Sequence, residues 1–164
     1  MSKLPQFIPK SNKSQELKQL INEALYIISK LGVPLEGLSQ RRLERIAMAF
    51  LAVANVKSSS DWENVKGYDG SHSLRTREII NYWNLNFDEN ISESFYDDIR
   101  RKDLKLLVLS GIIISSAGNP NAARNDSRRS FALSTEYAPL IKGFKVDSWE
   151  TDIEDFLANK VTLK

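Results

Sequence analysis

The chain has 164 residues, of which 41% are hydrophobic and 27% are charged, so it is long and apolar enough to form the core of one domain. It contains no cysteine, which excludes disulfide scaffolds, cysteine-based zinc sites and cysteine nucleophiles, and its apolar runs are shorter than the ~20 residues of a membrane span. The net charge is only +2, but residues 100–129 hold seven basic and two acidic side chains, whereas residues 147–155 hold five acidic side chains and no basic one. This distribution indicates a localised anion-binding face.

The chain is expected to begin with a free arm and two helices. Residues 1–13 lack the apolar core of a secretion signal, so we expect a cytoplasmic protein. The same residues are expected to form a flexible basic arm. Residues 14–31 space their apolar side chains as a helix does, and Ser14 is placed to cap its start. A second helix is expected over residues 39–54, capped by Ser39, and its broad apolar face predicts a position deep in the core.

A polar loop and two more helices are expected next. Trp62 lies in the loop and is expected to fix it to the domain. The third helix is predicted over residues 74–85 and the fourth over residues 93–110. Gly111 then stands where a helix most often takes a terminating glycine.

Residues 111–133 predict a wing, that is, two short strands joined by a long loop. The β-branched run IIISS and the run SFALS read as strands, and the loop between them is rich in Gly, Pro and Asn. Such a hairpin must pack on helices to be stable. We therefore predict a mainly α fold with a small β-hairpin: a winged helix-turn-helix domain over residues 14–144, with extra N- and C-terminal helices, the last within residues 145–164.

The predicted fourth helix is basic at its start and apolar at its end. On a wheel of about 100° per residue, Phe95, Ile99 and Leu106 fall on the core side, and Arg101 falls opposite. The last turn, which includes Leu109, is apolar nearly all round and should be covered on both sides. The recognition helix of a winged helix has this division, because its N-terminal half enters the major groove while its C-terminal half lies beneath the wing.

A solvated amphipathic helix would explain the same charges. Asp97 with Arg101, and Asp98 with Lys102, have the i, i+4 spacing of helical ion pairs, and charge runs are usually solvated faces. Asp103 fits neither interpretation, because it lies near the apolar side and needs a buried partner that the sequence does not identify.

Three groups of residues are candidates for contacts with double-stranded DNA, because arginine and lysine bind phosphates and guanine edges and asparagine can read adenine. On the fourth helix they are Arg101, Lys102 and Lys105, with Ser94, Tyr96 and Arg100 as secondary candidates; in the wing they are Arg124, Asn125, Arg128 and Arg129; at the start of the third helix they are Arg75 and Arg77. The wing could equally be a polar surface loop. Arg41, Arg42 and Arg45 are interpreted as a surface or salt-bridged face of the second helix.

The sequence shows no catalytic constellation. A Mg²⁺-dependent nuclease needs its carboxylates and lysine across a strand, whereas the acidic residues near lysines here lie in segments expected to be helical. The seven glycines are scattered, which excludes a glycine-rich phosphate loop, and His72 is expected to have only a polar role in a loop. We expect no catalytic residue, no metal site and no cofactor in this chain.

Residues 42–156 resemble the N-terminal helix-turn-helix domain of BsuBI/PstI-type restriction endonucleases. The resemblance is carried by RIAMAFLAVANV, DWENV, TREIINYWNLNF and SFYDDIRRKDLKLLVLSGIII. The paired arginines, aliphatic run and glycine of that family's recognition segment match Arg100, Arg101, Leu104, Leu106 and Gly111, and its Asn-Pro loop and Arg/Asn-rich wing match Asn119, Pro120, Arg124, Asn125 and Ser127. Phe131 stands where the family usually has tyrosine.

The resemblance implies that this chain is the recognition module of a Type II site-specific deoxyribonuclease in a restriction–modification system. The last 20 residues would lead toward a nuclease domain that is absent from this sequence, and Mg²⁺ is implied only for that domain. The implied partners are double-stranded DNA and a nuclease domain or subunit, with no membrane; palindromic targets would favour a homodimer. A repressor-type winged-helix regulator and a protein-interaction winged helix without a DNA role stay open as alternatives.

Overall fold

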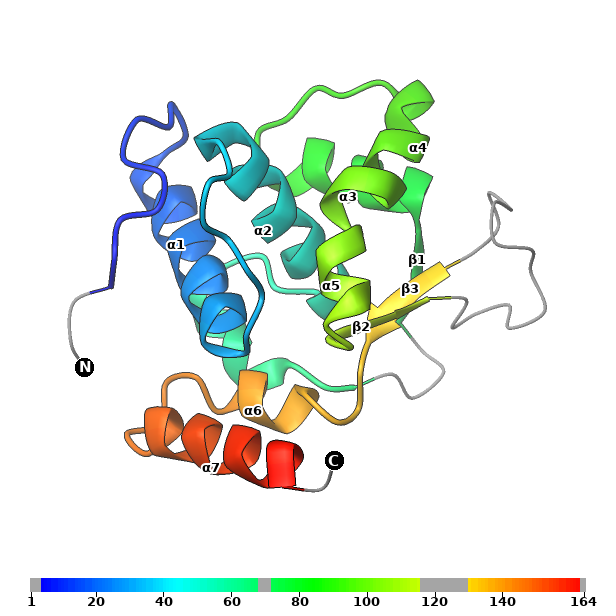
Figure 1. Cartoon of the computed structure of the whole chain (residues 1–164). Coiled ribbons are helices and arrows are strands. Elements are labelled where there is room, and N and C mark those ends of the chain that lie inside the picture. Colours follow the sequence, from blue (N-terminus) through cyan, green and yellow to red (C-terminus); the bar gives the residue numbers. More distant parts are fainter. Residues whose placement is uncertain (1–3, 68–71, 116–129, 163–164) are drawn as a thin grey trace.

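The computed structural model describes residues 4–67, 72–115 and 130–162 of the chain. Helices form most of the molecule, and a small sheet lies against one side of them (Figure 1). Within the described residues, no helix is long and apolar enough to cross a membrane.

Two long helices, α1 (Gln15–Lys30) and α2 (Gln40–Ala54), pack against each other through their apolar faces. Their starts are set by the predicted caps: Ser14 Oγ accepts a hydrogen bond from the Leu17 N–H, and Ser39 Oγ accepts one from the Arg42 N–H. Most of α2 is buried, which confirms its predicted position deep in the core.

Residues 4–13 pack on the helices. The side chain of Ile8 is fully buried in the core, and the Phe7 N–H donates to Asn22 Oδ1 on α1 at 3.0 Å. The prediction of a flexible arm over residues 1–13 is therefore wrong for its described part, because Ile8 supplies apolar surface that the core uses.

The loop after α2 is fixed by a buried tryptophan, as predicted. Trp62 lies in the 3-10 turn Ser59–Asn64 and is buried. Its indole N–H donates to Glu23 Oε1 on α1 at 3.0 Å, and the Ser59 hydroxyl donates to the same oxygen at 2.7 Å. The loop is thereby attached to α1 by both apolar and polar contacts.

The sheet has three strands, where the sequence predicts a two-stranded hairpin. β1 (Leu74–Arg75), β2 (Ile113–Ser115) and β3 (Ser130–Leu133) are antiparallel in the order β1-β3-β2. The sequence places residues 74–75 in the third helix, because two residues are too few to show the alternation of a strand. That helix, α3, instead covers Thr76–Asn86.

The predicted fourth helix is not a single α-helix. It consists of a 3-10 turn (Glu93–Phe95), one α-helical turn, α4 (Tyr96–Asp98), a π turn (Ile99–Asp103) and a short helix, α5 (Lys105–Leu109). The π turn closes with an i→i+5 hydrogen bond from the Leu104 N–H to the Ile99 carbonyl at 3.0 Å. We call residues 93–109 the basic segment.

The mixed winding of the basic segment changes which side chains are buried. A 3-10 turn winds more tightly than an α-helix and a π turn more loosely, so a wheel of constant angle loses register. Ile99 is buried as expected, but Phe95 is 48% exposed and Leu109 is 72% exposed. The prediction that Phe95 faces the core is therefore wrong. The prediction that the last turn is covered on both sides is wrong as well, because Leu109 lies at the surface. Gly111 does end the segment with the expected positive φ, at 81°.

Helices α6 (Ala138–Lys142) and α7 (Trp149–Thr162) close the molecule at the end away from α4 (Figure 1). Trp149 and Ile153 of α7 are buried in the same hydrophobic core as α1 and α2. The ring centres of Trp149 and of Tyr26 on α1 are 5.6 Å apart. α7 therefore packs as part of the same folded unit.

Candidate nucleic-acid interface

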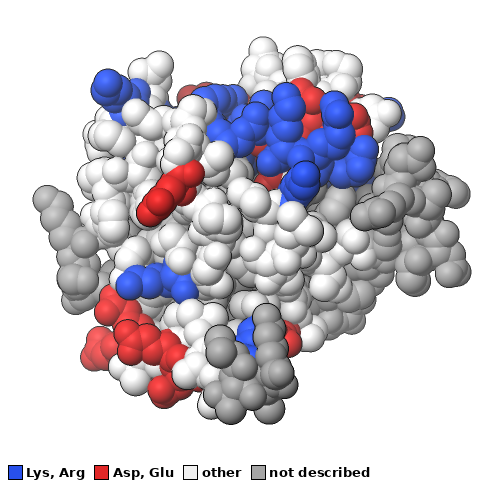
Figure 2. Space-filling model, viewed as in Figure 1, with Lys and Arg blue, Asp and Glu red and all other residues white. Residues whose placement is uncertain are grey.

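The basic segment presents a group of cations on one side of the molecule. The side chains of Arg101 and Lys102 are 59% and 51% exposed, and Lys105 is exposed as well. Figure 2 shows a patch of basic side chains over α4 and the π turn. The structure thus places the three primary candidates on one surface, with the half-buried Arg100 as a fourth cation of the same segment.

Two carboxylates lie within this patch. Asp97 accepts a hydrogen bond from Arg100 Nη2 at 2.6 Å and forms an ion pair with Arg101 Nε at 2.9 Å. Asp98 Oδ1 lies 4.0 Å from Lys102 Nζ. The hydrogen bond from Arg100 and the charge of Arg101 lower the pKa of Asp97, so its carboxylate is ionised at neutral pH. The ion pairs expected for a solvated helix are therefore present, and the cations are exposed beside them.

The start of α3 adds two exposed arginines. Arg75 pairs with Glu78 through Nε at 3.3 Å, and the guanidinium of Arg77 lies 4.7 Å from the ring centre of Tyr96 on α4. The stacking brings Arg77 and Tyr96, two sequence candidates, into contact at the beginning of the basic segment. Ser94 is exposed in the 3-10 turn just before α4.

The inner side of the basic segment is held by a buried ion-pair cluster, which we call the α2 clamp: Arg42, Arg45 and Asp103. The Asp103 carboxylate is fully buried; Arg42 Nη1 lies 2.5 Å from its Oδ1, and Arg45 Nη2 lies 2.9 Å from its Oδ2. This confirms the interpretation of these two arginines as salt-bridged. It also identifies the partners of Asp103, which sequence reasoning missed although two arginines three residues apart border the buried face of α2.

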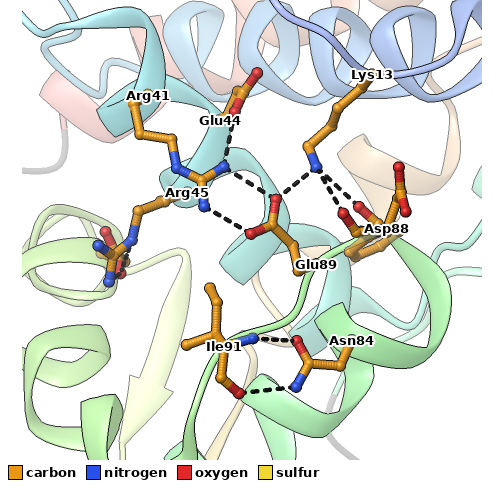
Figure 3. A network of polar contacts seen from close by, with 10 residues as sticks. Lys13, Arg41, Glu44, Arg45, Asn84, Asp88, Glu89 and Ile91 are labelled. Carbon is orange, nitrogen blue, oxygen red and sulfur yellow. Dashed lines mark hydrogen bonds and ion pairs between the residues drawn. The ribbon is translucent and has the colours of Figure 1, made fainter.

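A second polar cluster holds the turn between α3 and the basic segment (Figure 3). It consists of Lys13, Arg41 and Glu89, and we call it the turn lock. The buried carboxylate of Glu89 accepts from Arg41 Nη1 at 2.9 Å and Nη2 at 2.6 Å on α2, and from Lys13 Nζ at 2.5 Å. Lys13 also donates to the Phe87 carbonyl at 2.9 Å. Burial opposes the ionisation of Glu89, but the hydrogen bonds from Arg41 and Lys13 outweigh it and lower its pKa. No sequence pattern links these residues, which are 28 to 76 positions apart.

Asn84 closes the same turn through two hydrogen bonds between its side-chain amide and the backbone of Ile91. Asn84 Oδ1 accepts from the Ile91 N–H, and Asn84 Nδ2 donates to the Ile91 carbonyl, both at 2.9 Å (Figure 3). Asp88 between them has a φ of 55°, the left-handed conformation that sharp turns use. The backbone is thus fixed where it enters the basic segment.

The four wing candidates lie outside the described residues, since Arg124, Asn125, Arg128 and Arg129 belong to residues 116–129. The strands on either side of that range pair directly, with Ser115 opposite Phe131. Over residues 4–67, 72–115 and 130–160, no group of three or more His, Asp or Glu side chains could hold a metal ion.

The helix-turn-helix core consists of α2, α3 and the basic segment, with a fixed turn between the last two. Together with the three-stranded antiparallel sheet, these elements define a helix-turn-helix domain of the winged type, with additional helices at both ends. The chain belongs to the family described as the BsuBI/PstI restriction endonuclease HTH domain, whose sequence model matches residues 18–164. This confirms the family resemblance seen in the sequence.

Two relatives show how much of such proteins this chain represents. The Type II restriction enzyme BsuBI of Bacillus subtilis is 21% identical over 143 residues, which are 87% of this chain and 43% of the relative. The solved structure of the SdaI restriction endonuclease superimposes with a TM-score of 0.69 and 23% identity, over 84% of this chain and 41% of that one. The chain therefore spans less than half the length of each, and the structural likeness establishes the fold.

Proposed function

We propose that this chain binds double-stranded DNA in a sequence-specific manner, with the basic segment in the major groove, as the recognition module of a Type II restriction endonuclease. One observation carries the proposal: Arg101, Lys102 and Lys105 are exposed together on a segment whose inner side is anchored by the buried Asp103. A cationic helix backed by a core fits the major groove, which admits a helix.

The neighbouring elements support the same docking geometry. In helix-turn-helix domains the helix before the recognition helix crosses the DNA backbone. Here that helix is α3. The exposed Arg75, which precedes its first residue, and the exposed Arg77 in its first turn would contact phosphates flanking the groove. We propose that Arg128 and Arg129 contact the backbone or the minor groove and that Arg124 and Asn125 also contact DNA, because residues 116–129 connect β2 to β3 and β2 packs on α5.

The charge distribution supports one orientation on the duplex. Basic side chains gather over α4 and the π turn, while acidic side chains gather over α7 at the other end of the face shown in Figure 2. A polyanionic duplex is attracted to the first end and repelled by the second. The α2 clamp and the turn lock hold the basic segment in one position before binding, which reduces the entropy lost on association.

The wider role rests on the relatives. Both are restriction endonucleases more than twice as long as the matched region. We infer that DNA cleavage, with its Mg²⁺, belongs to a nuclease domain or subunit acting with this chain, and that a homodimer would read a palindromic site. A DNA methyltransferase gene next to this one would support the restriction–modification role, and an adjacent operator bound by the chain would favour a repressor.

A fluorescence anisotropy titration with duplex DNA at two salt concentrations tests DNA binding. The affinity is expected to fall steeply with salt, with a slope of log K against log salt of about −0.9 for each phosphate neutralised. Absence of binding at low salt would contradict the proposal and favour the protein-interaction alternative.

A further inference from the structure

We propose that Asp97 and Arg101 act together as the reader of one G·C base pair. The inference rests on the proposed function and deepens it, because it assigns a base preference to two particular side chains of the basic segment.

The geometry of the pair fixes how Arg101 can meet a ligand. Asp97 Oδ2 forms an ion pair with Arg101 Nε at 2.9 Å, and Asp97 Oδ1 accepts a hydrogen bond from Arg100 Nη2 at 2.6 Å. Arg101 Nη2 lies 3.7 Å from Asp98 Oδ1, beyond hydrogen-bond distance. The guanidinium is therefore held by its Nε edge, and its two terminal nitrogens are left to donate outward. A guanidinium presented end-on donates two parallel hydrogen bonds.

The carboxylate itself has a defined preference. An ionised Asp97 can only accept hydrogen bonds, and its side chain is 44% exposed, more than that of Asp98, the other carboxylate of the patch, at 30%. It repels phosphates, so it weakens indiscriminate binding to the duplex backbone. In the major groove it can be matched only by an exocyclic amino group of cytosine or adenine.

The two side chains together match one base pair better than the others. The major-groove edge of G·C offers two acceptors, guanine N7 and O6, beside one donor, the cytosine N4 amino group. Arg101 supplies two donors and Asp97 one acceptor, already held side by side in the free protein. An A·T pair places its donor between two acceptors and cannot satisfy both side chains in the same way.

Asp97 could instead serve only the helix, since a carboxylate at a helix start stabilises the helix dipole and pairs with a cation one turn later. These two roles differ in a measurable way. A purely structural Asp97 affects the melting temperature and leaves the base preference unchanged, whereas a reading Asp97 changes the base preference at one position of the target.

The test selects preferred duplexes from a randomised library with the full chain, its Asp97→Ala variant, which removes the acceptor oxygens, and a control, Glu93→Ala, which removes one negative charge from the same segment. The native chain is expected to select a site containing a defined G·C pair. Asp97→Ala should relax that position alone, and Glu93→Ala should leave the whole selected site unchanged. Equal selection by the native chain and Asp97→Ala would overturn the inference while leaving the proposed function intact.

A second measurement removes the matching atoms from the DNA. In the selected site, the cytosine is replaced by an analogue lacking the N4 amino group, and separately the guanine by 7-deazaguanine. The native chain should lose between about 5-fold and about 150-fold in affinity with each analogue, the range expected for one specific contact. Asp97→Ala, which has no acceptor at this position, should not respond to the missing amino group. A native chain that retains no duplex at low salt would refute the proposed function itself, and one that binds without any base preference would refute this inference.

Discussion

Asp103 is a buried carboxylate on the basic segment whose partners, Arg42 and Arg45, come from another helix. Neither helical periodicity nor a local motif indicates this contact, because 58 to 61 residues separate the partners. The sequence did mark the residue: a charge near an apolar side must have a partner, since an isolated buried charge is very costly. An unexplained buried charge is thus a useful pointer to a long-range contact, although the sequence does not say with which residue.

We expect Asp103→Ala to lower the free energy of unfolding by about 2–4 kcal/mol, because two guanidinium groups lose their common acceptor. Urea denaturation of the variant and of the native chain measures the difference. Asp103→Asn is the matched control, since it keeps the shape and an acceptor oxygen and should lose less. A change within about 0.5 kcal/mol, as for ordinary surface substitutions, would show that the α2 clamp does not stabilise the fold.

At the scale of elements, the sequence predicts helices and their ends better than it predicts how a helix winds. Ser14, Ser39 and Gly111 mark element ends through local side-chain and backbone chemistry, and all three act as expected. The π turn Ile99–Asp103 has no such mark, because its i→i+5 hydrogen bonds leave no sequence period of their own. The wrong burial of Phe95 follows from the assumption of a uniform helix, and that of Leu109 from the assumption that a turn apolar on all sides is covered on both sides.

Several residues of the candidate site could be found from the sequence, because exposed arginines and lysines on an amphipathic segment are visible in the pattern. The exposure of Arg101, Lys102 and Lys105 agrees with this reading. The turn lock could not be predicted in this way, because Lys13 lies in the expected arm and Glu89 lies between the third and fourth predicted helices. Residues that hold a site in place are set by tertiary contacts rather than by local pattern.

The turn lock predicts a pH dependence of stability. The pKa of Glu89 is lower in the folded chain than its unfolded value of about 4.3, so the unfolded chain binds more protons as the pH falls. The stabilisation is fully present above the unfolded pKa and is lost as the pH falls through the folded pKa. Urea unfolding from about pH 7 to about pH 3 should show Glu89→Gln less stable than the native chain at pH 7, with the gap closing in acid. A gap that is constant over this range would exclude the predicted role of the carboxylate.

At the scale of the whole molecule, DNA is expected to bind at one end only. The basic segment and the start of α3 lie at that end, and α6 and α7 close the other (Figure 1). The core shared by α1, α2 and α7 makes the molecule one folded unit, so a charge removed at either end should leave the fold intact while affecting DNA binding differently.

The most direct test compares the duplex affinity and its salt slope for Arg101→Ala and Lys105→Ala with those for Lys142→Ala on α6. All three variants remove one positive charge from an exposed side chain. We expect Arg101→Ala to lose about 1–3 kcal/mol of binding free energy and to relax base preference. Lys105→Ala should weaken binding, with a salt slope reduced by about 1 if Lys105 contacts a phosphate, and Lys142→Ala should bind as the native chain does. Equal losses in all three variants, or a loss confined to Lys142→Ala, would contradict this prediction.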